Sequence, residues 1–141
     1  MLLKACLNGA RAPGSHPALP LTPDDLARDA RAVVSAGAGA LHMHPRGADG
    51  RESLTAAVID AAVVAVRAAC PGVPVGVSTG AWIEPEAARR LAAVRSWRER
   101  PDFASVNFSE EGAEAVAAAL LEAGIGVEAG LWSEADARRL V

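Results

Sequence analysis

The sequence predicts an α/β protein built on a parallel sheet, and three observations lead to that class. Short apolar runs alternate with longer segments of helical periodicity. No hairpin turn signal joins two neighbouring apolar runs, which favours βαβ units. Hydrophobic residues make up 51% of the 141 residues and aromatic residues only 4%, so Ala, Val and Leu must fill the core. That composition is typical of helices packed closely on parallel strands.

Five apolar runs are the expected strands, and a helical segment follows each of them. The strands are expected at residues 2–8, 40–44, 73–78, 103–107 and 125–128. The helices are expected at about residues 22–37, 53–70, 84–100, 110–123 and 133–141. Because βαβ crossovers are right-handed, the carboxyl ends of all five strands should meet at one edge of the sheet.

Start and stop signals support the helices, from the first to the last. Thr22 suits the N-cap of the first helix, because Pro23 fits its first position and Asp25 completes a capping-box pair. Gly37 is the expected stop of that helix. Ser133 is the expected cap of the last helix, which has a start signal but no stop signal.

Two architectures fit five βα units. One is a complete doubly wound, flavodoxin-like sheet, and the other is the first part of an eight-unit barrel, which typically needs about 250 residues. The missing stop signal in the last helix favours the second. We therefore expect a parallel (βα) TIM-barrel type, with residues 1–141 as the N-terminal portion of a single catalytic domain, a half-barrel fragment of five βα units.

Composition and charge exclude several functions. The net charge is −3 and acidic and basic residues are interspersed, so neither a nucleic-acid surface nor a membrane-binding patch is expected. No apolar run approaches the roughly 18 residues of a membrane span. Cys6 and Cys70 are too few for a disulfide framework. We expect a cytoplasmic protein.

Polar residues stand at the end of every expected strand. They are Asn8, His42 with His44, Ser78 with Thr79, Asn107, and Glu128. In parallel α/β proteins the functional groups collect at the carboxyl ends of the strands. Five polar ends in phase therefore predict one shared mouth, although each residue alone could simply begin a solvated loop.

The pair His42 and His44 is the sharpest feature of that mouth. Side chains at positions i and i+2 of a strand share a face, so the two imidazoles point the same way. Two imidazoles and one carboxylate form a common catalytic zinc set that leaves a position open for water or substrate. The alternative is a pair of hydrogen-bonded core histidines.

Two further groups are candidate binding elements. Ser78, Thr79 and Gly80 form a strand-to-loop transition whose hydroxyls and backbone N–H groups would hold a carboxylate, although the same residues also make ordinary turns. Glu128 stands where an apolar residue is expected. It is a candidate metal ligand, base or partner for a cationic substrate group, or else one half of an ion pair.

Taken together, these motifs resemble the β-keto acid cleavage enzyme family, which includes 3-keto-5-aminohexanoate cleavage enzymes. The similar stretches are Leu7-Asn8-Gly9-Ala10, residues 16–23, His42-Met43-His44-Pro45-Arg46, and residues 77–83, 104–108 and 127–132. The resemblance implies a zinc-bound TIM barrel, with zinc or another divalent cation as cofactor. It also implies a retro-Claisen exchange in which a β-keto acid and acetyl-CoA become acetoacetate and a new acyl-CoA.

The resemblance also assigns roles to residues. His42 and His44 would be two zinc ligands, and the zinc would polarise the β-keto oxygen. Ser78 and the amides after it would hold the substrate carboxylate, with Ser105 and Asn107 nearby. Glu128 would line the pocket and select the distal group of the substrate.

This chain departs from the family pattern at its end. The family's third zinc ligand is a glutamate in a late Gly-Leu-Glu-Asp stretch, followed by an acid used in proton transfer. The similar stretch Gly130-Leu131-Trp132 lies on an earlier strand and carries Trp instead. Both the third ligand and the catalytic acid are therefore expected beyond Val141. Where some relatives carry an acid after the first strand, this chain has Arg11.

Two other functions stay open from the sequence. Amidohydrolase-like metal hydrolases also use His-x-His, but usually on the first strand rather than the second. The second alternative is a non-catalytic half-barrel that assembles with another chain through its exposed fifth strand. Because an unpaired edge invites association, we expect a homo-oligomer.

Overall fold

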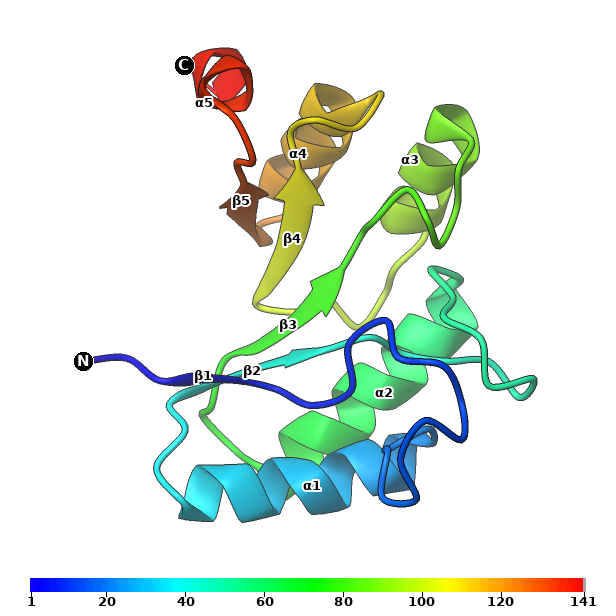
Figure 1. The fold of residues 1–141 in the computed structure, drawn as a ribbon, viewed down its shortest axis with the longest axis vertical. Helices are drawn as coiled ribbons and strands as arrows, with labels where there is room; N and C mark the ends of the chain where they lie inside the picture. Colours follow the sequence, from blue (N-terminus) through cyan, green and yellow to red (C-terminus); the bar gives the residue numbers. More distant parts are fainter. Residues whose placement is uncertain (141) are drawn as a thin grey trace.

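The computed structural model describes residues 1–140, in which five strands and five helices alternate. They are β1 (Lys4–Cys6), α1 (Pro23–Ser35), β2 (Ala40–Met43), α2 (Ala56–Ala69), β3 (Val75–Ser78), α3 (Ala87–Arg95), β4 (Phe103–Asn107), α4 (Ala113–Glu122), β5 (Gly126–Gly130) and α5 (Glu134–Leu140). The strands are parallel and lie in the order β1-β2-β3-β4-β5 (Figure 1). The α/β prediction is confirmed. Strands in sequential order are those of a barrel, because a doubly wound sheet reverses its order.

The first and last helices begin as the sequence predicts. The Thr22 hydroxyl accepts a hydrogen bond from the Asp25 backbone N–H at 3.1 Å, and the Asp25 carboxylate accepts one from the Thr22 N–H at 3.2 Å. The bonds from Thr22 lower the pKa of Asp25 to about 2. At α5 the Ser133 hydroxyl accepts from the Asp136 N–H at 3.2 Å. Val141, the last residue of that expected helix, lies outside the described residues.

Three helices have bounds that differ from the prediction, and among them α3 and α4 begin at Ala87 and Ala113 rather than at residues 84 and 110. Helix α2 begins after Thr55 rather than at Ser53. Helix α3 ends at Arg95 rather than near residue 100, because Trp97 turns into the core and its indole N–H donates to the Leu54 carbonyl at 2.8 Å. Within residues 1–140, no helix combines the length and the apolar composition that crossing a membrane requires.

The outer face of the sheet forms the hydrophobic core with the helices. Its side chains are aliphatic and at most 2% exposed, and they are Leu41, Met43, Val75, Val77, Ala104 and Val106. Helices α1 to α4 cover this side, which leaves the opposite side of the curved sheet free of helices (Figure 1). The alternation of side chains along each strand therefore divides the sheet into an aliphatic outer face and a second, inner face.

The inner face carries polar and small residues together with the ring of Phe103. Its side chains come from the alternate positions of the strands, among them Lys4, His42, Gly76, Ser78, Phe103, Ser105, Asn107 and Glu128. Lys4 on β1 forms an ion pair with Glu128 on β5, so the sheet curls enough for its first and fifth strands to meet through their side chains. Phe103 packs on Gly76, where any Cβ would overlap the ring. The ring thus fills the space beneath His42, 6.4 Å away between ring centres.

Candidate functional site

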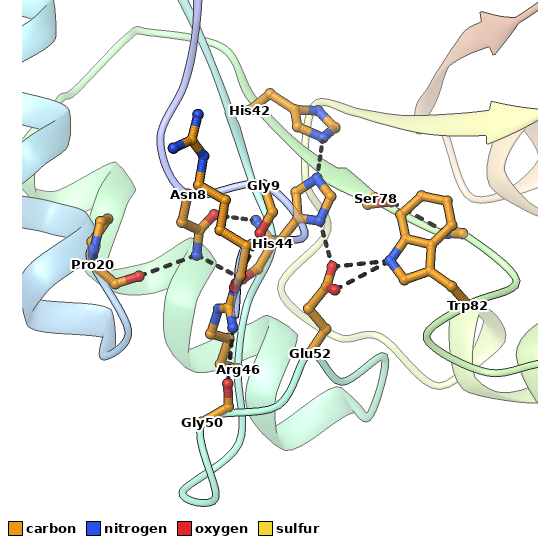
Figure 2. Close-up of polar contacts among 12 residues, drawn as sticks. Asn8, Gly9, Pro20, His42, His44, Arg46, Gly50, Glu52, Ser78 and Trp82 are labelled. Atoms are coloured by element: carbon orange, nitrogen blue, oxygen red, sulfur yellow. Dashed lines mark hydrogen bonds and ion pairs between the residues drawn. The ribbon is translucent and has the colours of Figure 1, made fainter. Parts of the chain in front are cut away.

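The centre of the site is the histidine pair at the carboxyl end of β2. His42 and His44 lie on the inner face and are 7% and 9% exposed. Their Nε2 atoms are 3.3 Å apart, and the rings meet edge to face with centres 5.2 Å apart (Figure 2). The structure therefore brings the two imidazoles together, as the strand spacing predicts.

The separation of these two nitrogens fits a shared metal ion, and in metal-free protein it is also a hydrogen-bond distance between the two rings. Two nitrogens that bind one tetrahedral zinc at about 2.0–2.1 Å lie about 3.3 Å apart. Among residues 1–140, no third His, Cys, Asp or Glu joins them in a metal-binding group. The described residues thus offer two candidate ligands, fewer than the four of a complete tetrahedral shell.

His42 is held in its neutral form by its surroundings. Burial, and next the neighbouring His44, lower the pKa of His42 from 6.5 to about 4, and Lys4 adds to the effect while Glu128 opposes it. At neutral pH one of its two ring nitrogens therefore carries a free lone pair, as a metal ligand requires. His42 Nδ1 is buried and has no hydrogen-bond partner in residues 1–140. Glu128 Oε2 is 3.8 Å from it, beyond hydrogen-bond distance.

His44 is held much more tightly than His42. Its backbone N–H donates to the Asn8 amide oxygen at 2.8 Å, and its carbonyl accepts from the Asn8 amide nitrogen at 2.9 Å. Its ring Nδ1 contacts the Glu52 carboxylate. Asn8 also donates to the Pro20 carbonyl at 3.2 Å. Both the amide oxygen and the amide nitrogen of Asn8 are thus engaged within the protein. This arrangement favours a role for Asn8 in holding the backbone after β2 over a role in binding a substrate.

The predicted carboxylate-binding turn lies beside the histidines at the end of β3. The Ser78 hydroxyl accepts from the Gly80 backbone N–H at 3.3 Å, and its own proton has no acceptor within residues 1–140. The Thr79 hydroxyl instead donates to the Ser105 carbonyl at 2.7 Å. Ser78 is therefore the residue of this turn with a donor left for a ligand, while Thr79 ties β3 to β4.

The candidate residues on β4 differ in how they are engaged. Ser105 is half-buried on the inner face, next to Ser78 in register. The Asn107 amide nitrogen donates to Glu110 at 2.8 Å, and its oxygen accepts from the Trp132 indole at 3.1 Å. Asn107 therefore ties two loops of the mouth together.

Glu128 lies on the inner face but is already paired. Its carboxylate contacts the Lys4 ammonium, which also lies 5.7 Å from the centre of the Phe103 ring. The ion pair that the sequence left open as an alternative is thus present. Ionic pairing with a substrate cation would require the substrate to compete with Lys4.

The roles of three residues near the histidines were not predicted from the sequence. They are Lys4, Glu52, and Arg46, which ties two loops together. Arg46 is 7% exposed and donates to the carbonyls of Gly9 and Gly50 at 2.9 and 3.0 Å. It pairs antiparallel with Glu52 across the turn between them. The turn signal at residues 47–50 could have predicted the position of Glu52, because a tight turn reverses the chain and brings Glu52 back beside the histidine strand.

Fold and site together define a protein of the parallel βα-barrel class, with polar strand ends on the side of the sheet that no helix of residues 1–140 covers. The family model described as "beta-keto acid cleavage enzyme" matches residues 1–131. The chain therefore belongs to the beta-keto acid cleavage enzyme family, which confirms the resemblance found in its motifs.

Two curated relatives carry the name 3-keto-5-aminohexanoate cleavage enzyme. That of Fusobacterium nucleatum is 33% identical over 81 residues, which are 57% of this chain and 30% of the relative. That of Acetoanaerobium sticklandii is 29% identical over 108 residues, which are 76% of this chain and 38% of the relative. The matched part of this chain thus corresponds to about a third of the length of each.

Two solved barrel structures share the fold. An isomerase from Streptomyces coelicolor A3(2) has a TM-score of 0.55 and 25% identity, over 99% of this chain and 37% of the other. An enolase from Streptomyces coelicolor has a TM-score of 0.57 and 27% identity, over 99% of this chain and 35% of the other. These likenesses confirm the predicted barrel class.

Proposed function

We propose that this chain carries part of the active site of a zinc-dependent β-keto acid cleavage enzyme, an acyltransferase. The observation that supports this most directly is the 3.3 Å separation of His42 Nε2 and His44 Nε2 on the inner face. Family membership supports the reaction class, because the named relatives are cleavage enzymes. Another divalent cation could take the place of zinc, because the same two imidazole ligands also suit other transition metals.

The proposed reaction exchanges one acyl group for another. The C2–C3 bond of the β-keto acid breaks, and its acetate unit forms a new bond to the acetyl carbonyl carbon of acetyl-CoA. The CoA sulfur leaves that carbon and joins the acyl group released from the keto acid, so acetoacetate and a new acyl-CoA result. When bound, zinc supplies a Lewis acid for the keto oxygen.

The residues of the chain then have separate tasks. His42 and His44 hold the metal, and the low pKa of His42 keeps its nitrogen unprotonated at neutral pH. The Ser78 hydroxyl donates to the carboxylate of the keto acid, with Ser105 beside it in register. Asn8, Thr79, Gly80 and Asn107 shape the mouth through the contacts described above. The acid that moves the proton is expected outside residues 1–140.

Glu128 would tune which keto acid fits. Because Lys4 neutralises it, an ammonium on the substrate must displace Lys4, whereas a neutral hydrogen-bonding group can share the carboxylate with it. This argues for keto acids whose distal end is a neutral hydrogen-bond donor over those that carry an ammonium group.

The oligomeric state, cellular location and partners of the protein also stay predictions. A homo-oligomer in the cytoplasm, without nucleic acid or membrane as partner, fits the mixed surface charge and the two sheet edges, β1 and β5, that have one neighbouring strand each in residues 1–140.

The experiment is to isolate the protein from its source, measure its bound metal, and assay acetoacetate formation from acetyl-CoA and a panel of β-keto acids. Zinc, together with acetoacetate that appears only when CoA thioester and keto acid are both present, is the expected result. Release of acid without CoA thioester would indicate a metal-dependent hydrolase instead. Absence of both zinc and turnover would reject the proposal.

A further inference from the structure

Glu52 lies where it can fix the orientation of one metal-binding histidine. Its carboxylate contacts His44 Nδ1, and the side chain of Glu52 is 13% exposed. A neutral imidazole that donates from Nδ1 carries its lone pair on Nε2. That Nε2 is the atom facing His42 Nε2 at 3.3 Å. The contact thus selects the form of His44 that can bind a metal beside His42.

Trp82 holds Glu52 from the other side. Its indole Nε1–H donates to both oxygens of the Glu52 carboxylate, at 3.1 and 3.3 Å. Its ring stacks on His44, with centres 6.2 Å apart and planes 23° from parallel. Figure 2 shows the resulting chain of contacts from His42 through His44 and Glu52 to Trp82.

The stacking of Trp82 on His44 depends on a glycine at position 80. A Cβ on Gly80 would overlap the six-membered ring of Trp82, so the ring can take its place only over a glycine. Gly80 was predicted as part of a carboxylate-binding turn. Its missing side chain has the additional effect of admitting the indole beside His44.

The two histidines differ in this respect. His42 Nδ1 is buried without a hydrogen-bond partner in residues 1–140, whereas His44 Nδ1 has a carboxylate. A histidine ligand whose second nitrogen is fixed by a carboxylate has its tautomer and ring orientation set in advance, and loss of such a partner typically weakens metal binding by about 10–100-fold.

We propose that Glu52 is a positioning residue for His44, and that Trp82 is the clamp that keeps the Glu52 carboxylate on His44 Nδ1. The backbone of Glu52 is held by its antiparallel bridge to Arg46, and the two contacts of its carboxylate with His44 and Trp82 fix the side chain. The inference rests on the proposed metal site but can be tested without a metal.

Two measurements test it on the full chain. The first is the tautomer of His44 in metal-free protein, from the chemical shifts of its ring nitrogens. The second is zinc affinity from competition with a coloured chelator. Glu52→Ala removes the acceptor, and we expect a mixture of tautomers and about 10–100-fold weaker zinc binding. Glu52→Gln keeps one acceptor oxygen without the charge, and we expect a smaller loss of zinc affinity.

Trp82→Phe is the matched test of the clamp, because it keeps an aromatic ring over His44 but removes the N–H donor. We expect a loss of zinc affinity between those of Glu52→Gln and wild type. Trp132→Phe is the control: it removes an indole that donates to Asn107 and lies outside the Glu52 contacts, so the His44 tautomer should not change.

Wild-type tautomer and wild-type zinc affinity in folded Glu52→Ala would overturn the proposal. Thermal unfolding curves show which variants are folded, and if Glu52→Ala is not, Glu52→Gln and Trp82→Phe decide by the same two measurements. If wild-type protein binds no zinc, the proposed function fails. The metal-free tautomer measurement then still decides whether Glu52 positions His44.

Discussion

The two faces of the sheet use the same strands for different purposes. On the outer face, Leu41 and Val77 are 0% exposed and pack against helices. On the inner face, the residues that directly follow them in the sequence are His42 and Ser78, which are polar. Residues one position apart on a strand thus face a dry aliphatic core or the polar mouth.

The two faces therefore contribute differently, the outer face to the stability of the fold and the inner face to ligand binding. The outer face gains free energy from burying aliphatic surface, at about 25 cal/mol per Å². The inner face buries polar groups, which contribute only when they are paired, and His42 Nδ1 has no hydrogen-bond partner in the part of the chain that the structure describes. Substitutions on the outer face should therefore change folding, and those on the inner face should change ligand binding.

The largest effect on stability is expected from Leu41→Ala on the outer face. Leu41 is fully buried in the core, so the truncation leaves a cavity and should lower the free energy of unfolding by about 3 kcal/mol. Ser105→Ala on the inner face is the control, with an expected change below about 0.5 kcal/mol. Urea unfolding of both variants checks this, and equal losses would contradict the division between the faces.

The second effect is a dependence of stability on pH in metal-free protein. The pKa of His42 is about 4 in the folded state and 6.5 ordinarily, because burial and His44 disfavour its charge while Glu128 and Lys4 act in opposite directions. Between these values the unfolded chain binds more protons. Stability should be complete above about pH 6.5 and fall by at most about 3 kcal/mol toward pH 4.

His42→Gln is the comparison for that prediction, since it keeps a polar side chain but cannot titrate. Unfolding measured at pH 7 and pH 5 should show a loss in wild type that is smaller in the variant. The same loss in both would mean that His42 is not the group responsible.

A smaller effect is expected at Ser78. Its hydroxyl keeps a free donor on the inner face, so Ser78→Ala should weaken binding of a β-keto acid about tenfold, or about 1.4 kcal/mol, while CoA binding stays the same. Thr79→Ser, which keeps the hydroxyl that bonds to β4, is the control. Calorimetric titration with keto acid and with CoA separates the two. An unchanged keto acid affinity would remove Ser78 from the site.

The smallest effect concerns Glu128 and its partner. Glu128→Gln leaves Lys4 without its counter-charge and should shift the preference toward substrates with an anionic or neutral distal end, by a few-fold, with the metal content unchanged. Relative turnover of paired keto acids measures the preference. Loss of zinc in this variant would instead make Glu128 a metal ligand.

Most of the fold was predictable from the sequence, because it depends on local signals. The capping box at Thr22 and the N-cap at Ser133 lie within a few residues of the helices they begin. Strand β4, at Phe103–Asn107, has the predicted bounds. The histidine pair was also predictable, since strand periodicity alone puts both rings on one face.

What could not be predicted depends on contacts between distant segments. Lys4 and Glu128 are 124 positions apart and meet only because the sheet curls. The sequence suggested a ligand-binding Asn8, yet its amide is used on the backbone of His44, 36 positions away. Periodicity shows which face a side chain takes but not which partner it finds there.

The most direct test of the central claim is zinc stoichiometry and affinity of the purified protein, compared with His42→Ala, His44→Ala and His16→Ala. The third variant removes a histidine of the exposed loop before α1 and serves as the control. We predict one zinc per chain in wild type and in His16→Ala, and at least about 100-fold weaker binding in the other two. Equal zinc binding in all four proteins would contradict a metal site on the inner face of β2.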